Sequence, residues 1–157
     1  MELRKAGWAD SVFLLNLRND ETVRRSSFNQ DMVEPAGHER WLTKKLADAD
    51  TYLFIAEQNG QRLGQIRFEL NGEKNLAEVS IAVAKEFRGK GIGVSMLLAG
   101  CPLIFAATGV EVILAQIRAE NLLSRRMFER AGFQLDSTLS GCDKDVLSMV
   151  LENLTGK

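Results

Sequence analysis

The alternation of apolar and polar residues predicts a series of β-strands in the first half of the chain. Leu3 to Ala6 is a short candidate, and Thr51 to Glu57 is a longer one that is rich in β-branched and aromatic residues. Asn59-Gly60, the strongest hairpin signal in the sequence, leads to a strand from Gln61 to Leu70. After a looser turn, Ala77 to Val83 alternates again. The pattern therefore predicts three consecutive antiparallel strands between residues 51 and 83.

Apolar residues at helical spacing predict two helices in the N-terminal part of the chain. The first begins after Asp10, a plausible N-cap, and ends at Arg18-Asn19-Asp20. The second spans roughly His38 to Ala47, and Pro35 suits its entrance. The polar and basic segment Glu21 to Phe28 lies between them. It is either a solvated turn of helix or one edge of a cleft.

The second half of the chain alternates helices with strands. A nearly all-apolar helix runs from Ile92 to Gly109, and the apolar strand Val110 to Ile117 follows it. Because a helix separates this strand from the preceding one, we expect the two strands to pair in parallel. An amphipathic helix between Asn121 and Gly132 comes next. Gln134 to Leu139 and Asp145 to Glu152 then predict a closing hairpin.

Composition indicates one domain over residues 1–157. The chain is 45% hydrophobic, and its 20 Lys and Arg against 21 Asp and Glu give a net charge of −1, so no overall basic field favours nucleic acid. Cys101 and Cys142 form no C-x-x-C pair, and with a single histidine they make no metal site. The longest apolar run, Ile92 to Ala107, is short for a membrane span, and no signal peptide opens the chain. We expect a cytoplasmic protein without membrane partners.

A glycine-rich loop, Arg88-Gly89-Lys90-Gly91-Ile92-Gly93, separates the strand Ala77 to Val83 from the apolar helix. Glycines let the backbone approach a ligand closely, and the first N–H groups of a helix lack internal partners, so this loop predicts a phosphate site. The spacing of its glycines is neither the dinucleotide fingerprint nor a P-loop.

The loop resembles the R-G-x-G-x-G/A acetyl-CoA pyrophosphate loop of the GNAT N-acetyltransferases. A second GNAT signature, N-x-x-A/S-x-x-x-Y/F-x-x-x-G-F, follows in the family's order and spacing, and its residues here are Asn121, Ser124, Phe128, Gly132 and Phe133. The resemblance implies an α/β (α+β) fold, a single GNAT-type domain with a mixed, mostly antiparallel sheet of about seven strands flanked by helices. Its fourth and fifth strands would splay apart.

Acetyl-CoA as co-substrate is part of what this resemblance implies. The pantetheine arm would lie in the splay against the backbone of Ile81, Ala82 and Val83. The diphosphate would bind the loop from Arg88 through Gly89, Lys90, Gly91 and Ile92 to Gly93. Asn121 and Ser124 would line the arm, and Phe128 would lie beside the thioester.

The acceptor is expected on the other side of the cleft. Arg18, Arg24 and Arg25 would attract an anionic substrate, and the pair His38 and Trp41 shares a helix face on which a planar group could stack. These N-terminal motifs resemble a branch with sugar-nucleotide N-acetyltransferases of the pseudaminic-acid type and ribosomal-protein N-acetyltransferases. A nucleotide-linked amino sugar is the first hypothesis. A protein N-terminus or a non-catalytic CoA-binding module are the alternatives, and a homodimer stays open.

Direct acetyl transfer needs an unprotonated amine, and candidate bases are few. Glu78 is the one ionisable residue on its strand and could act directly or through a water held with Ser80, or could be a paired strand-edge carboxylate. Gln116 occupies the place where some relatives carry a glutamate base. Phe128 replaces the tyrosine that protonates the departing thiolate in most of the family. The lack of a glutamate at position 116 and of a tyrosine at position 128 favours an amine with a pKa near ~8 over a lysine with a pKa near ~10.4.

Overall fold

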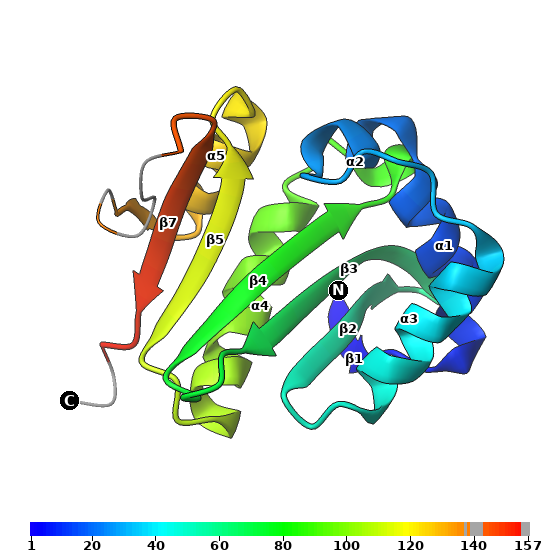
Figure 1. Ribbon diagram of the computed structural model, residues 1–157, viewed down its shortest axis with the longest axis horizontal. Helices are drawn as coiled ribbons and strands as arrows, with labels where there is room; N and C mark the ends of the chain where they lie inside the picture. Colours follow the sequence, from blue (N-terminus) through cyan, green and yellow to red (C-terminus); the bar gives the residue numbers. More distant parts are fainter. Residues whose placement is uncertain (137, 139–142, 155–157) are drawn as a thin grey trace.

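A mixed sheet forms the centre of the computed structural model, which describes residues 1–136, 138 and 143–154 (Figure 1). Within these residues the strand order is β1-β2-β3-β4-β5-β7-β6, and β4 and β5 are the one parallel pair. The seven-stranded sheet and the parallel pairing confirm the predictions. The strands are β1 (Glu2–Lys5), β2 (Thr51–Gln58), β3 (Gln61–Leu70), β4 (Leu76–Val83), β5 (Val112–Arg118), β6 (Gln134–Leu135) and β7 (Val146–Glu152).

Helices cover both faces of the sheet. Alternate residues of β2 separate the two layers, since Phe54 packs in the cluster with α4 while Leu53 and Ile55 pack in the cluster with α1 and α3. In the view of Figure 1, α4 crosses behind the sheet. The helices are α1 (Ser11–Asn19), α2 (Glu21–Ser26), α3 (Pro35–Ala47), α4 (Ile92–Ala107) and α5 (Leu122–Arg130).

Two boundaries differ from the sequence prediction. α3 begins at Pro35, three residues before His38, because proline fits the first turn of a helix. Within the predicted strand Gln134 to Leu139, the described residues form β6 over Gln134–Leu135; Leu139 lies outside the described residues, as does Cys142.

The pairing of β4 with β5 stops early. Their register covers Leu76 with Val112, Ala77 with Ile113 and Glu78 with Leu114, although β4 continues to Val83 and β5 to Arg118. The two strands therefore splay apart at their C-terminal ends, as the family resemblance implied. On its other side β4 stays paired with β3 from Ala77 to Val83.

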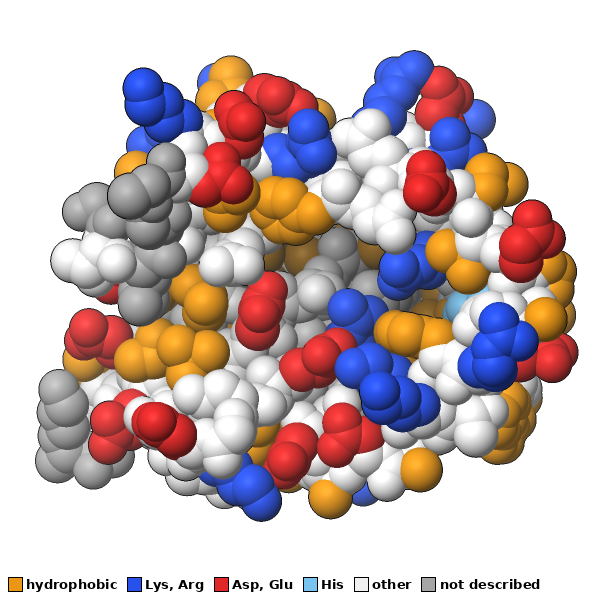
Figure 2. Space-filling view, in the orientation of Figure 1, with side chains coloured by type: hydrophobic (Ala, Val, Ile, Leu, Met, Phe, Trp, Pro, Cys, Tyr) orange, Lys and Arg blue, Asp and Glu red, His pale blue; other side chains and the backbone are white. Residues whose placement is uncertain are grey.

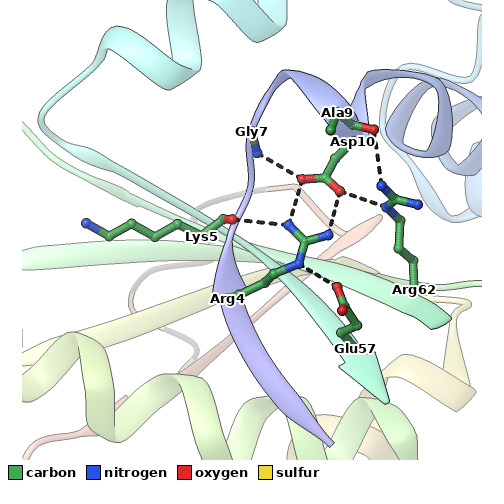
Figure 3. A network of polar contacts seen from close by, with 7 residues as sticks. All are labelled: Arg4, Lys5, Gly7, Ala9, Asp10, Glu57 and Arg62. Carbon is green, nitrogen blue, oxygen red and sulfur yellow. Dashed lines mark hydrogen bonds and ion pairs between the residues drawn. The ribbon is translucent and has the colours of Figure 1, made fainter. Parts of the chain in front are cut away.

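A buried carboxylate ties β1 and β3 to the start of α1 (Figure 3). Asp10 is 1% exposed and accepts hydrogen bonds from Arg4 at 2.7 and 2.9 Å, from Arg62 Nε at 2.7 Å and from the Gly7 amide at 2.9 Å. Arg4 also pairs with Glu57 of β2. Asp10 does precede α1, but its side chain makes no hydrogen bond to that helix, because both oxygens serve these partners.

Candidate active site

The splay opens into a cavity of about 760 Å³. Figure 2 shows this face of the molecule hollowed between the two halves of the sheet, with basic side chains gathered on the side of α1 and α3. Residues of β4, β5, α5 and the loop before α4 line one part, and residues of α1, α2, α3 and β3 line the other. The cavity thus joins the predicted coenzyme side to the predicted acceptor side.

The glycine-rich loop presents its main chain to this cavity. Gly89 and Gly91 both have a φ of 76°, a left-handed conformation that favours glycine, and Gly91 is the N-cap of α4. The first N–H groups of α4 have no intrahelical acceptors, as at any helix start. Gly93 has a packing role, because a Cβ there would lie 2.4 Å from Sδ of Met127 on α5. The loop can bind an anion such as a diphosphate through backbone amides.

The two basic side chains of the loop are placed differently from the expectation. Arg88 lines the cavity, but its Nε donates to the Val83 carbonyl at 3.0 Å and its Nη2 to Asp20 Oδ1 at 2.8 Å. Lys90 is exposed, lies outside the cavity lining and has its Nζ 5.9 Å from the centre of the Phe87 ring. The main chain of the loop, rather than these two side chains, is what the structure offers to a phosphate.

The remaining predicted coenzyme residues converge on the splay. Ile81, Ala82 and Val83 line it from β4, where the strand has left β5. Asn121 caps α5 by accepting a hydrogen bond from the Ser124 amide at 3.1 Å, which confirms it as the N-cap, and both residues line the cavity. Phe128 also lines it but is 3% exposed and packs edge-on against Phe133, with ring centres 5.0 Å apart.

Two arginines and an indole lie together on the predicted acceptor side. The guanidinium carbons of Arg18 and Arg67 lie 5.8 and 5.1 Å from the centre of the Trp41 ring. Burial lowers the pKa of Arg18, and the positive charge of Arg67 lowers it further. Arg18 and Trp41 were predicted on this side of the cavity, whereas Arg67 was not. The predicted β3–β4 hairpin could have indicated Arg67, because its register sets this residue opposite Ser80.

His38 stacks against Trp41, with ring centres 5.7 Å apart and an interplanar angle of 25°. The imidazole is buried, its Nε2 lies 3.1 Å from the Ser11 carbonyl, and burial lowers its pKa, so it is neutral near pH 7. Its Nδ1 and the Oε1 of Gln65 are buried and have no hydrogen-bond partner in the described part of the chain. Both residues line the cavity, so a ligand with N–H or O–H groups could satisfy them.

Glu78 and Ser80 face the cavity from β4, opposite Glu69 and Arg67 of β3. Arg67 donates to Ser80 Oγ at 3.3 Å and also pairs with Glu69. Glu78 remains accessible to solvent; desolvation by its neighbours and then repulsion from Glu69 raise its pKa, although Arg67 opposes this. A raised pKa makes Glu78 a stronger proton acceptor than an ordinary glutamate, provided that it is deprotonated at the working pH.

Arg24 and Arg25 do not line the cavity. Arg24 donates to the Gln30 carbonyl at 3.2 Å, and Arg25 pairs with Glu21 on the exposed surface of α2. α2 is a separate short helix, so the side chains after Asp20 do not continue the phase of α1. The structure therefore gathers Arg18 and Arg67, rather than Arg18, Arg24 and Arg25, at the acceptor side.

The described residues include no group of three or more His, Cys, Asp or Glu side chains that could hold a metal ion. In residues 1–136, 138 and 143–154 no helix combines the length and the apolar character that crossing a membrane requires.

Comparison with known proteins agrees with this geometry. The family model for the acetyltransferase (GNAT) domain matches residues 1–134. The L-methionine sulfoximine/L-methionine sulfone acetyltransferase of Pseudomonas aeruginosa is 27% identical over 142 residues, which cover 87% of this chain and 82% of that protein.

Solved structures show the same architecture. The spermidine N-acetyltransferase of Vibrio cholerae in complex with CoA and spermine superposes with a TM-score of 0.85 at 21% identity, covering 96% of this chain and 94% of that one. The ribosomal-protein-alanine N-acetyltransferase of Brucella melitensis gives a TM-score of 0.81 at 25% identity, over 98% and 100% of the two chains.

Proposed function

Because this chain belongs to the acetyltransferase (GNAT) domain family and is an acetyl-CoA-dependent N-acetyltransferase, we propose that its acceptor is a small primary amine that also carries an anionic group. The observation that carries this proposal is the placement of Arg18 and Arg67 over one indole ring in a partly enclosed cavity.

Two guanidinium groups this close repel each other, and desolvation makes that repulsion more costly. A bound carboxylate or phosphate between or beside them removes the cost, and arginine suits the geometry of both anions. A polyamine or an aminoglycoside would instead bring positive charge beside Arg18, for which the described residues supply no ion-pair partner, whereas Arg67 already pairs with Glu69. The arginines therefore favour an anionic acceptor over a polycationic one.

The coenzyme side fits acetyl-CoA. Backbone amides at Gly89 to Gly93 suit a diphosphate, and the free edge of β4 at Ile81 to Val83 suits the amides of a pantetheine arm. Acetyl-CoA supplies an activated thioester. Asn121 and Ser124 would line the arm on the opposite wall of the splay.

In direct transfer the amine nitrogen forms a bond to the acetyl carbon and the bond from that carbon to sulfur breaks. The proton leaving nitrogen would go to Glu78, directly or through a water held with Ser80. Phe128 has no proton to offer, so water protonates the thiolate, whose conjugate thiol has a pKa near ~8.5. This arrangement suits an amine with a pKa near ~8, whose deprotonation near pH 7 to 8 costs much less than that of a lysine.

A nucleotide-linked amino sugar fits these requirements if its diphosphate binds Arg18 and Arg67. The ring of Trp41 is already covered by these two arginines and by His38, so we assign it to holding the arginines rather than to stacking a nucleobase. An amino acid is the second candidate, because the relative from Pseudomonas aeruginosa acts on L-methionine sulfoximine, which carries a carboxylate beside its amine. A peptide N-terminus is the third.

The experiment is an acceptor panel read as kcat/KM by release of the CoA thiol. It contains amino-sugar nucleotides, L-methionine sulfone, short peptides, spermidine and an aminoglycoside. We expect the best anionic amine to exceed spermidine at least tenfold. We also expect Arg67→Gln to raise the KM of that amine while leaving the KM of acetyl-CoA within about twofold. The reason is that Arg67 would bind the amine equally well in the ground state and in the transition state.

Arg25→Gln is the matched control, because it removes the same charge outside the cavity and should leave both KM values unchanged. Preference for spermidine or the aminoglycoside would overturn the anionic acceptor. Absence of turnover with every amine, despite acetyl-CoA binding, would favour a CoA-binding module instead.

A further inference from the structure

We propose that Arg88 is a positioning residue that connects the coenzyme loop to the acceptor side of the site through Asp20. This inference rests on the proposed function, because it assigns the two sides of the cavity to coenzyme and acceptor. It gives Arg88 a role other than that of a diphosphate ligand.

The guanidinium of Arg88 is committed to two protein partners. Its Nε donates to the carbonyl of Val83, the last residue of β4, and its Nη2 donates to Asp20 Oδ1. The side chains of the ion pair are 27% and 23% exposed, so the pair is shielded more than a surface salt bridge. Arg88 therefore joins the end of the splayed strand to a residue 68 positions away.

Asp20 stands at the junction of α1 and α2. The same oxygen that binds Arg88 also accepts hydrogen bonds from the amides of Thr22 at 3.0 Å and Val23 at 3.1 Å, and so caps α2. Although burial raises the pKa of Asp20, the hydrogen bond from Arg88 and those from the two amides lower it overall. The Asp20 carboxylate thus fixes the start of α2 and also holds α2 at a set distance from the coenzyme loop.

These contacts reach the acceptor side directly. Thr22 and Val23 line the cavity, and Arg18, on the last turn of α1, precedes Asp20 by two residues. On the opposite side of the splay, Arg118 at the end of β5 donates to the carbonyl of Ser27 at 3.4 Å, just after α2. The segment that carries α2 is therefore held from the β4 side by Arg88 and from the β5 side by Arg118.

From this geometry, a loop ordered by coenzyme also orders Arg88, which in turn fixes Asp20, the start of α2 and the end of α1. Loss of either member of the pair should then weaken acceptor binding while the main-chain amides of residues 89 to 93 still hold the diphosphate. If Arg88 were instead a ligand of the diphosphate, its loss would weaken CoA binding and leave acceptor binding unchanged.

The test compares Arg88→Ala, Asp20→Asn, the double variant and Lys90→Ala, which removes a charge from the same loop outside the cavity. Asp20→Asn keeps an oxygen that can cap α2 but loses the charge that holds Arg88. Isothermal titration gives the Kd for CoA, and steady-state kinetics with the best amine of the panel gives both KM values.

We expect Arg88→Ala and Asp20→Asn each to raise the acceptor KM at least fivefold, and the double variant to be no worse than the poorer single variant, because both remove one link. The Kd for CoA should change less than threefold in all four variants. A tenfold loss of CoA affinity in Arg88→Ala without a matching loss in Asp20→Asn would overturn the proposal, as would effects on the acceptor KM that multiply.

Hydrogen exchange provides a readout that needs no acceptor. CoA should slow exchange of the Thr22 and Val23 amides in the unmodified protein, and this slowing should disappear in Arg88→Ala. If it persists in Arg88→Ala, the link through Asp20 is refuted. If no amine is turned over but the slowing behaves as expected, the acceptor assignment fails while the link stands.

Discussion

Replacing Asp10 by asparagine tests how firmly the N-terminal network holds α1. The buried carboxylate accepts three hydrogen bonds from two guanidinium groups and one from a backbone amide. In Asp10→Asn the amide NH₂ would face a guanidinium, and the network would keep one carboxylate, Glu57 beside Arg4, for two arginines (Figure 3). Because α1 presents Arg18 to the cavity, this perturbation also bears on the acceptor side.

The magnitude follows from burial. Removing one partner of a buried ion pair costs ~3–5 kcal/mol, but Arg4 and Arg62 are 39% and 36% exposed and can turn towards water, so we expect about 2–3 kcal/mol. For a chain of this size that corresponds to a fall in Tm of roughly 4–12 °C. Urea denaturation of both proteins at pH 7 measures the difference in the free energy of unfolding.

The pH dependence supplies a second check. The arginines hold the pKa of Asp10 well below its usual range, despite its burial. The ion pair therefore contributes fully above the unfolded-state pKa of ~3.9 and is lost as pH falls from there towards the lower folded-state pKa. The difference in stability between the two proteins should stay constant from pH 5 to 8 and should shrink below pH 4.

Glu21→Gln is the matched control, since its partner Arg25 and Glu21 itself are largely exposed, and it should change the free energy of unfolding by less than about 0.5 kcal/mol. An Asp10→Asn effect no larger than that of the control, or a difference that grows between pH 5 and 8, would refute the reasoning.

Further variants test the site and the core. Glu78→Gln should lower kcat/KM and abolish the acid limb of its pH profile, because the base must be deprotonated to act. In the unmodified protein this limb should lie above the pKa of an ordinary glutamate, since the pKa of Glu78 is raised. Phe128→Tyr should change kcat by less than about tenfold, and a larger gain would show that thiolate protonation limits the rate. Gly64→Ala should lower the free energy of unfolding by about 1–3 kcal/mol in urea, because its Cβ would lie 2.4 Å from a carbonyl oxygen of β4. Burial raises the pKa of the Cys101 thiol to about 12, so in a Cys142→Ser background iodoacetamide at pH 8 should label the unfolded chain and leave the folded chain unlabelled.

Local signals in the sequence were enough to predict the glycine-rich loop and the start of α5. The loop from Arg88 to Gly93 and the helix start at Asn121 are each defined by residues close in sequence, so glycine conformations and capping chemistry predict them. The parallel pairing of β4 and β5 follows from the helix between them. The hydrogen bond between Arg88 and Asp20 has no local signal in the sequence, because the two residues lie 68 positions apart.

The acceptor side depends on contacts that no local pattern contains. Arg67 of β3 reaches Trp41 because α3 packs against the neighbouring strand β2, and Asp10 meets Arg62 across 52 positions. Arg24 and Arg25 were predicted beside Arg18, but Asp20 has a ψ of 135° that breaks the helix and changes the direction of the following side chains. Tertiary packing and a single backbone angle therefore decide which arginines face the cavity.

The early end of the pairing between β4 and β5 leaves the sheet unfinished. A coenzyme arm along the open edge would serve as a substitute strand and would lend its binding free energy to the fold. At a concentration 100 times Kd that gain is about 2.7 kcal/mol. The abundance of the enzyme would then follow the supply of its own co-substrate, since chains without it would open more often to proteases.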